Sequence, residues 1–550
     1  MNRVLANRFY YLENFETVLH WIEQRHNDLL AQPERDFITR FLMLPRPSRA
    51  LLVRMIMRKG TLFRSGKLRY DEVGDSTVAA LTLVDQGWLD DHPAVTIEEL
   101  FSLLTKAEIS NIFAASLPNK NLKKTEQLII LGAQSTEARQ FGDWWDGAAE
   151  PVYRLLIMPL CERFRLMFFG NLRQDWSEFV LADLGLYAYE KVDFAPDSRV
   201  FRTRRDIDDY LHLHDCRERF RAGASPELVM EELPSLPYQN EWLEQRRAKL
   251  LFQIAQHYEK AGDWLNALDA YSSCGHIGAR LRTIRVLERS GQFEPALALA
   301  RIAWRQPESE TESQRLNRIV PRLERRLIGH IAPRERMAPI ARLTIALPKP
   351  PTVVAVEELA REHLQRQSHG TVHYVENALV NALFGLLCWE SIFAAIPGAF
   401  FHPFQRGPAD LYSADFYQRR KTRFSACLAQ LESGQYKQTI FRNFKEKAGI
   451  RSTFVAWEVI SEEILKQALS CIPATHLKKC FERMLLDVAS NRSGFPDLIQ
   501  FWPFEKRYRM IEVKGPGDRL QDNQLRWLDY CAVNDMPAVV CHVQWAQAAS

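Results

Sequence analysis

The apolar residues of this chain follow one period along most of its length and another at its C-terminal end. Up to about residue 345 they recur at helical spacing, as in "FETVLHWIEQ", "VYRLLIMPLCERFRLMFFG" and "RRAKLLFQIAQHYEKAG". Spacings of three and four residues place apolar side chains on one face of a helix. Strand-like alternation is rare before residue 490. The patterns therefore predict a multidomain, mainly α protein that ends in a small α/β domain.

A chain of 550 residues is too long for one hydrophobic core. Its 46% hydrophobic and 25% charged residues exclude disorder over most of the length. "LPKPP" at 347–351 is typical of an exposed linker and marks the start of the last domain. The predicted domains are a basic N-terminal region at 1–90, a helical domain at 91–240, a helical-hairpin domain at 241–347 and an α/β domain at 348–550.

The nine cysteines are dispersed and form no CxxC pair, which predicts reduced thiols and no zinc finger of the usual spacing. The N-terminal residues lack an apolar core of signal length and a small-residue cleavage site, so no secretory leader is expected. The apolar stretch 378–401 contains Asn381, Glu390 and Pro397. It therefore predicts a buried helix followed by a loop, and no membrane contact. "HLHDC" at 212–216 falls in a helical context that is expected to splay its side chains, so no metal site is predicted there.

Basic residues cluster between residues 45 and 70, where eight stand without one acidic residue. Clustered cations release counterions from nucleic acid, so the segment predicts a helix and hairpin that lie along phosphates. A solvated basic face is the alternative. The candidate DNA-binding residues here are Arg54, Arg58, Lys59, Arg64 and Lys67.

Residues 97–132 read as two short helices joined by an Asn/Pro turn. Lys120, Lys123 and Lys124 surround the start of the second helix, and lysines at a helix N-terminus suit a phosphate. The layout resembles the SAP DNA-binding module.

A short internal echo occupies the third predicted domain. "GDWLNA" at 262–267 is matched by "GQFEPA" at 291–296, each with a glycine, an aromatic residue and an alanine in the same places. The glycine would end one helix, and the other two residues would pack the next helix against it. The echo resembles helical hairpins of the tetratricopeptide kind.

The segment "GFPDLIQFWPFEKRYRMIEVKGPGDRL" at 494–520 predicts a hairpin of strands 498–502 and 508–513. Residues two apart on a strand share a face, so Glu512 and Lys514 point the same way and Val513 turns into the core. Antiparallel pairing brings Asp497 opposite Glu512. Two converging carboxylates repel each other unless a divalent cation, Mg²⁺ or Mn²⁺, binds between them. The Val513 carbonyl is a further candidate ligand, and Lys514 could hold the attacking water.

A helix at 518–533 and a strand at 536–543 follow the hairpin. This order is the core layout of the PD-(D/E)xK nuclease superfamily, which usually adds a carboxylate from a preceding helix. Glu376 and Glu390 both qualify, because fourteen residues on a helix return to within about 40° of the same face. Glu376 lies at the polar start of the predicted helix. Glu390 lies in its most apolar part, where a buried or capping residue is expected.

"EVKGPGDRL", "FPDLI" and "VEN…LFGLLCWESIF" resemble the VRR-NUC domain of the Fanconi-associated nucleases, and the order of the preceding modules is similar too. The resemblance implies metal ligands at Glu376, Asp497, Glu512 and the Val513 carbonyl. It also implies a catalytic Lys514, a supporting Gln524 and two Mg²⁺ or Mn²⁺ ions. The family's activity would be cleavage of 5′ flaps and 5′-to-3′ trimming of branched DNA in interstrand-crosslink repair.

Several alternatives stay open at this point. The charges could be solvated residues of an edge hairpin, the chain could be a DNA-binding scaffold with a degenerate nuclease fold, or it could be a restriction-type or RNA-directed nuclease. The ubiquitin-binding zinc finger of higher relatives has no counterpart here. The resemblance thus implies a bacterial, cytoplasmic, nucleoid-associated protein, whereas a eukaryotic one would be nuclear. Dimerisation on DNA is open.

Overall fold

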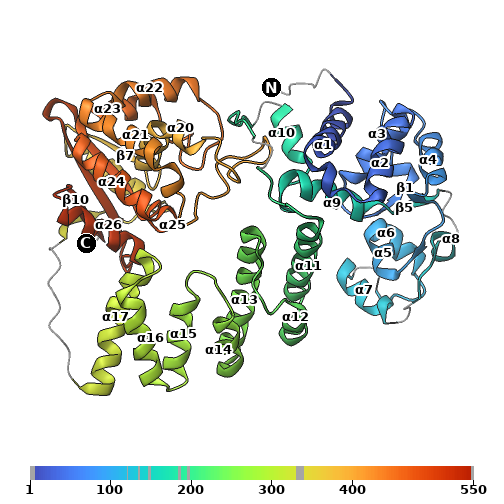
Figure 1. Cartoon of the computed structure of the whole chain (residues 1–550), viewed down its shortest axis with the longest axis horizontal. Coiled ribbons are helices and arrows are strands. Elements are labelled where there is room, and N and C mark those ends of the chain that lie inside the picture. Colours follow the sequence, from blue (N-terminus) through green and yellow to red (C-terminus); the bar gives the residue numbers. More distant parts are fainter. Residues whose placement is uncertain are drawn as a thin grey trace. The chain divides into compact units, whose positions relative to one another are not determined.

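The chain forms two compact units in its computed structural model (Figure 1). The first comprises Met1–Tyr187 and Phe201–Ile207, and the second comprises Ala188–Val200 and Asp208–Ser550. The structure describes residues 7–119, 122–133, 137–145, 150–183, 187–194, 198–329, 340–352 and 354–546. All nine cysteines are buried and free, as expected of reduced thiols.

The first unit opens with a helical cluster packed around phenylalanines. Its helices are α1 (Tyr10–His26), α2 (Gln32–Met43), α3 (Arg46–Ile56), α4 (Ser76–Asp85), α9 (Met158–Phe169) and α10 (Ser177–Asp183). A three-stranded sheet of order β1-β5-β2 lies with them, formed by β1 (Leu62–Arg64), β5 (Val152–Leu155) and β2 (Leu89–Asp90). The helical prediction was wrong over β5, because Val152 and Leu155 are buried by pairing with neighbouring strands. The helix starts only at Met158, where Pro159 favours an N-terminal turn.

Residues 97–132 form three helices rather than the two predicted. They are α5 (Ile97–Leu103), α6 (Lys106–Ile112) and α7 (Lys124–Gly132). Thr105 accepts a hydrogen bond from the backbone N–H of Glu108, and Glu108 accepts one from the N–H of Thr105. This capping box starts a new helix and separates α5 from α6. Strands β3 (Ala94–Val95) and β4 (Arg139–Gln140) pair antiparallel beside them.

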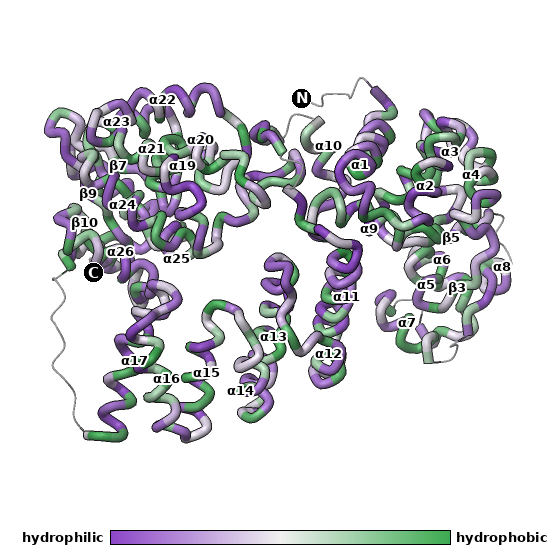
Figure 2. Tube along the Cα trace, viewed as in Figure 1, coloured by the Kyte–Doolittle hydropathy of each residue, from purple (hydrophilic) through white to green (hydrophobic). Residues whose placement is uncertain are grey.

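The second unit contains an array of helices. They are α11 (Arg204–Arg221, in this unit from Asp208 on), α12 (Pro226–Glu232), α13 (Glu241–Ala261), α14 (Trp264–Ser272), α15 (Ala279–Arg289), α16 (Phe293–Arg305) and α17 (Glu310–Ile328). Gly262 and Gly291 have φ of +79° and +81°, and both echo alanines, Ala267 and Ala296, are fully buried. The hairpin prediction is confirmed. Figure 2 shows α11 and α17 as largely hydrophilic.

The array does not begin at residue 241 as predicted. The Tyr258 hydroxyl of α13 donates a hydrogen bond of 2.9 Å to Glu227 of α12, and Arg247 Nε donates one of 2.8 Å to the carbonyl of Pro234. Residues 208–240 therefore pack with the array, in the same compact unit.

The α/β domain is built on a five-stranded sheet of order β6-β10-β9-β8-β7. Its strands are β6 (Ala341–Leu347), β7 (Thr371–Tyr374), β8 (Leu498–Trp502), β9 (Arg507–Lys514) and β10 (Ala538–Trp545). β10 pairs parallel with β6 and β9, while β8 pairs antiparallel with β7 and β9. The predicted hairpin is confirmed. The sheet starts before the predicted boundary at 348, because β6 pairs with β10 along its whole length.

Helices cover both faces of this sheet. Ile511 and Val513 face α18 (Val356–Arg366) in one buried cluster. Met510 faces a larger cluster formed with α19 (Leu379–Leu387), α24 (Ala474–Leu486) and α26 (Asp522–Val533). Every residue of α19 is buried, and no helix in the described ranges is long and apolar enough to cross a membrane.

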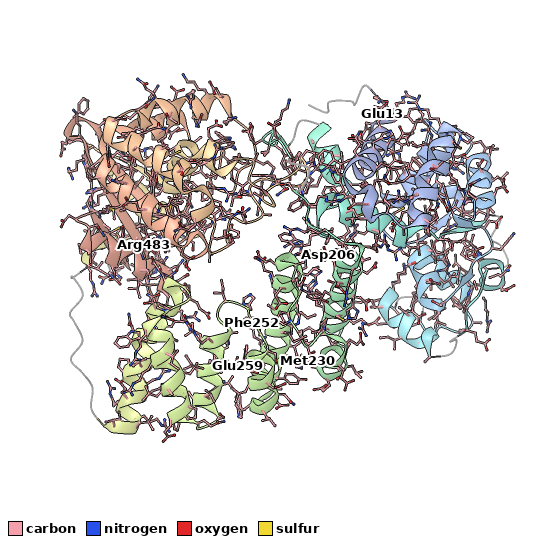
Figure 3. The ribbon with its side chains drawn as sticks, in the orientation of Figure 1. Glu13, Asp206, Met230, Phe252, Glu259 and Arg483 are labelled. Carbon is pink, nitrogen blue, oxygen red and sulfur yellow. The ribbon has the colours of Figure 1, made fainter. Side chains whose placement is uncertain are left out.

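Arg483, labelled in Figure 3, joins the helical array to the α/β domain. It is 6% exposed and pairs with Glu310 of α17 at 2.6 Å. It also donates to the Arg526 carbonyl of α26 and lies over the Trp527 ring. The start of α26 is held from the same side, because Arg318 pairs with Asp522 at 2.7 Å.

Candidate active site

Asp497, Glu512 and Lys514 meet at the hairpin of β8 and β9. The backbone N–H of Val513 donates a hydrogen bond of 2.8 Å to Asp497 Oδ2, and Lys514 Nζ lies 2.8 Å from Glu512 Oε1. The pairing of Leu498 with Ile511 places Asp497 beside Glu512. Val513 packs into the core cluster on the other face of the sheet, as the alternation predicted.

Both carboxylates are buried where a negative charge is costly. Asp497 is 6% exposed and Glu512 is fully buried. Burial raises the pKa of Asp497 to about 6, with Glu376 adding to the rise and the Val513 N–H opposing it. Burial and the charge of Asp497 raise the pKa of Glu512 to about 7. Among the described residues, Lys514 Nζ is the one group that reaches Glu512 Oε1, and Glu512 Oε2 has no hydrogen-bond donor. Two buried carboxylates side by side, with Glu512 Oε2 lacking a donor, offer the oxygen ligands that a divalent cation requires, so the residues fit a metal ion.

Glu376 reaches the same place from a turn and not from the helix that the sequence pattern predicts. It stands between β7 and α19 and is exposed. The Val375 N–H donates a hydrogen bond of 2.9 Å to the Asp497 carbonyl, which extends β7 alongside the start of β8. The carboxylate accepts hydrogen bonds from the Tyr374 hydroxyl at 2.6 Å and from Asn377 Nδ2 at 3.2 Å. Its charge contributes to the raised pKa of both Asp497 and Glu512.

Glu390, the competing candidate, lies in the first turn of α20 (Trp389–Ile392) and is exposed, so of the predicted buried or capping roles the buried one is wrong. α19 ends at Leu387, so residues 376 and 390 never share one helix face. Gln524 lies in the first turn of α26, and its Oε1 accepts a 2.8 Å hydrogen bond from the Gln521 N–H. Within the described part of the chain, no hydrogen bond joins Gln524 to the carboxylates.

Tyr374 and Asn377, which hold Glu376, were not among the predicted residues. The only sequence signal for them is their place beside Glu376 in "HYVEN".

The predicted DNA-binding residues fall into two groups. Arg54 pairs with Glu72 at 2.5 Å, and Arg64 pairs with Glu108 at 2.6 Å and Glu150 at 2.5 Å. The Arg64 side chain is only 10% exposed, so these two arginines bind their own unit. The acidic partners lie outside the 45–70 window, which is why the sequence pattern missed them.

The other predicted cations keep their charge at the surface. Four of them have exposed side chains: Arg58, Lys59, Lys67 and Lys123. Lys124 is half-buried and donates a 2.7 Å hydrogen bond to the Leu104 carbonyl. Arg58 donates to the Lys67 carbonyl and to the Tyr70 hydroxyl, both uncharged. Lys67 and Arg69 line a hollow of about 1040 Å³. Lys120 lies outside the described residues.

His212 and Cys216 come closer than the sequence pattern predicts. Four residues on a helix return to within about 40° of the same face, and with Glu232 these two side chains place ligand atoms within 4.8 Å of one another. Each group already has a partner, however. Arg219 Nη1 donates to Glu232 Oε1 at 2.9 Å, and His212 Nε2 bonds the Glu232 carbonyl at 3.0 Å. The cluster is a satisfied surface network.

An acidic pair and a lysine on neighbouring strands, in a sheet flanked by helices, define a metal-dependent phosphodiesterase domain of the PD-(D/E)xK type. Three domain families match the chain. The VRR-NUC domain matches residues 431–545, the FAN1 HTH domain matches 9–90, and the Fanconi anemia-associated nuclease SAP domain matches 94–144. Glu376 lies outside the VRR-NUC match.

Full-length relatives agree with the domain matches. The Fanconi-associated nuclease 1 homolog of Pseudomonas aeruginosa is 55% identical over 541 residues, which cover 98% of this chain and 97% of that protein. The Arabidopsis thaliana homolog is 24% identical over 97% of this chain and 67% of its own length. This chain belongs to the Fanconi-associated nuclease family. It is a DNA nuclease, and its nuclease domain depends on a divalent metal ion.

Solved structures give the same result. A crystal structure of paFAN1 bound to 2nt 5′flap DNA with a gap superposes with a TM-score of 0.96 at 54% identity. The match covers 99% of this chain and 100% of the solved one. A second structure of that protein, bound to 1nt 5′flap DNA with a gap, has a TM-score of 0.93.

Proposed function

We propose that this nuclease cuts DNA at 5′ flaps and trims it in the 5′-to-3′ direction, and that it serves interstrand-crosslink repair in the bacterial cytoplasm. The likeness to a Pseudomonas aeruginosa protein solved on 5′-flap DNA supports the substrate and the bacterial setting. The observation that carries the proposal is the pair of buried carboxylates, Asp497 and Glu512, beside Lys514.

Glu376, Asp497, Glu512 and the Val513 carbonyl would hold one or two Mg²⁺ or Mn²⁺ ions. The oxygen-only donor set favours these hard cations over zinc. When bound, the cation supplies Lewis-acid polarisation of the phosphate. The strand pairing supplies the rest, because the Val513 N–H holds Asp497 in place and the sheet fixes Glu512 and Lys514 on one face.

Lys514 acts on the attacking water and on the charge of the phosphate. Its Nζ is held against Glu512 Oε1 at 2.8 Å, and its side chain is 10% exposed. An ammonium group in so dry a place stabilises the negative charge that develops on the phosphoryl oxygens. It also orients the water oxygen toward phosphorus. Gln524, at the start of α26, would support the site from the solvent side.

The first unit would bind duplex DNA through its exposed cations. Arg58, Lys59, Lys67 and Lys123 keep their charge outward, and in the described part of the chain no carboxylate pairs with them. Phosphate contacts of this kind position DNA without reading its sequence. Structure selectivity rather than sequence specificity follows from such a surface.

Carboxylate-to-amide substitutions test the active site. Asp497→Asn and Glu512→Gln should each lower the cleavage rate of an end-labelled 5′-flap DNA by at least about a thousandfold, because removal of the charges abolishes the cation site. DNA affinity, measured by fluorescence anisotropy, should change less than about threefold.

Parallel reactions on 3′-flap DNA, single-stranded DNA and RNA of the same sequence define the substrate class. Full activity in either variant would refute the assigned site. Preference for RNA or for a 3′ flap would refute the proposed substrate instead.

A further inference from the structure

We infer that Asn377 is a positioning residue that sets Glu376 in register with Asp497 and thereby determines the affinity of the metal site. The inference rests on the proposed function of these two carboxylates as ligands. It concerns a residue that supports the ligands without being one of them.

The backbone of Asn377 is held in a conformation that most residues avoid. Its φ is +50°, one of three positive values among the non-glycine residues of the described chain. A left-handed residue at this point turns the chain sharply from β7 into α19. Such a conformation costs of order 1 kcal/mol or more and persists only where the surroundings hold it.

The side chain of Asn377 joins the two segments that carry the ligands. Its Oδ1 accepts hydrogen bonds from the backbone N–H groups of Gly494 at 2.7 Å and Phe495 at 3.1 Å. Its Nδ2 donates to Glu376 Oε1 at 3.2 Å. Because two N–H donors meet at one end of the amide, the orientation of that amide is fixed. One side chain therefore ties the Glu376 carboxylate to the loop that leads into Asp497.

Neighbouring contacts make this tie rigid. Asn381, one helical turn on and 3% exposed, donates to the Asn377 carbonyl at 2.5 Å and to the Arg492 carbonyl at 2.8 Å. On the strand side, the Val375 N–H bonds the Asp497 carbonyl. Glu376 thus lies between two fixed points on the 492–497 segment. Groups that orient metal ligands in this way typically change metal affinity 10- to 100-fold when removed.

Two substitutions distinguish the hydrogen bonds of Asn377 to the 494–495 backbone from its hydrogen bond to Glu376. Asn377→Gly keeps the positive φ and loses both side-chain contacts, whereas Asn377→Asp keeps the acceptor for the loop and loses the donor to Glu376. We expect Asn377→Gly to weaken Mn²⁺ binding by about 10- to 100-fold. Asn377→Asp should disturb Glu376 alone, because its second carboxylate oxygen repels Glu376 where Nδ2 donated, while the contacts to the loop stay. Asp535→Gly, at another positive φ of +56° in the turn before β10, is the matched control and should bind Mn²⁺ as the wild type does.

Mn²⁺ binding to the 550-residue chain without DNA, measured by calorimetry and electron paramagnetic resonance, is the primary measurement. Metal titrations of flap cleavage should show the same shift in half-saturating Mn²⁺, with kcat largely restored at high Mn²⁺. An unchanged Mn²⁺ binding isotherm in Asn377→Gly would overturn the inference. This holds also if the variant melts at a lower temperature, because the residue would then serve stability alone.

The variant Glu512→Gln shows whether the role of Asn377 or the proposed metal site itself is wrong. If that variant binds Mn²⁺ normally, the metal site itself is assigned to the wrong residues. If it does not bind Mn²⁺ while Asn377→Gly does so normally, only the role of Asn377 is wrong.

Discussion

At the scale of single residues, the active site depends on a loop that cannot accept a side chain. Gly494 has φ of +96°, and a Cβ there would lie 2.6 Å from the backbone of Asn523 in α26. The same residue donates its N–H to Asn377, three positions before Asp497. The loop is therefore pressed between the start of α26 and the turn that carries Glu376.

Gly494→Ala should reduce flap cleavage by about tenfold to a hundredfold, because a shift of about 1 Å in a reacting group costs that much. Single-turnover cleavage at saturating Mn²⁺ measures the effect. Gly434→Ala is the matched control, since Gly434 also has a positive φ of +82° but nothing lies within 4 Å of its added Cβ. Both variants carry the same backbone strain. Equal activity of the two would contradict the role of close packing at residue 494.

The sequence predicted how the strands place Glu512 and Lys514, but it did not predict the side chains that hold Glu376. Alternation along 508–514 places Glu512 and Lys514 on one face, and the strand register followed from the hairpin. Asn377 could not be found in this way, because its role depends on a hydrogen bond to residues 117 and 118 positions later. The ion pairs of Arg64 could not be found for the same reason, since its acidic partner Glu150 is 86 residues away.

At the scale of elements, periodicity identified the hairpin, α26 and the helical array, but it missed short strands whose partners are distant. β5 and β6 pair with strands distant along the chain, and of the two only β6 alternates, with Ile345 and Leu347 buried. A buried histidine lies in the segment between α20 and α21, where α21 is Lys421–Ser433. The spacing of apolar residues did not predict its burial. His402 is 2% exposed, and its Nδ1 accepts a 3.1 Å hydrogen bond from the Phe404 N–H.

Burial lowers the pKa of His402 to about 3, so the folded protein holds it neutral while the unfolded chain binds a proton below about pH 6.5. Stability is then complete above pH 6.5 and is lost as the pH falls toward 3. Between pH 7 and pH 5 this one group should lower the free energy of unfolding by about 2 kcal/mol. Urea unfolding of the full chain at several pH values measures the slope. His402→Asn keeps a hydrogen-bond acceptor but does not titrate. Between pH 7 and pH 5 its free energy of unfolding should therefore fall by about 2 kcal/mol less than that of the wild type. An equal fall in both proteins would contradict the burial of a neutral His402.

At the scale of the whole molecule, the two units hold different parts of the proposed activity, the exposed cations in one and the carboxylates in the other. Charge reversal of Arg58, Lys59 and Lys67 should therefore weaken duplex binding and lower the slope of log Kd against log salt by about one for each phosphate that the variant no longer binds. Cleavage at saturating DNA should keep its kcat, because these residues do not touch the carboxylates. Arg64→Glu should behave differently, since it breaks the pairs with Glu108 and Glu150 and lowers the melting temperature of the first unit.

Anisotropy titrations from low to high salt, together with steady-state cleavage, separate these outcomes. Active-site variants such as Glu512→Gln form the reverse control, with normal binding and salt slope but no cleavage. If the triple reversal leaves the salt slope unchanged, the 45–70 segment lies outside the DNA interface. If it lowers kcat at saturating DNA as strongly as it weakens binding, then the division of binding and chemistry between the two units is wrong.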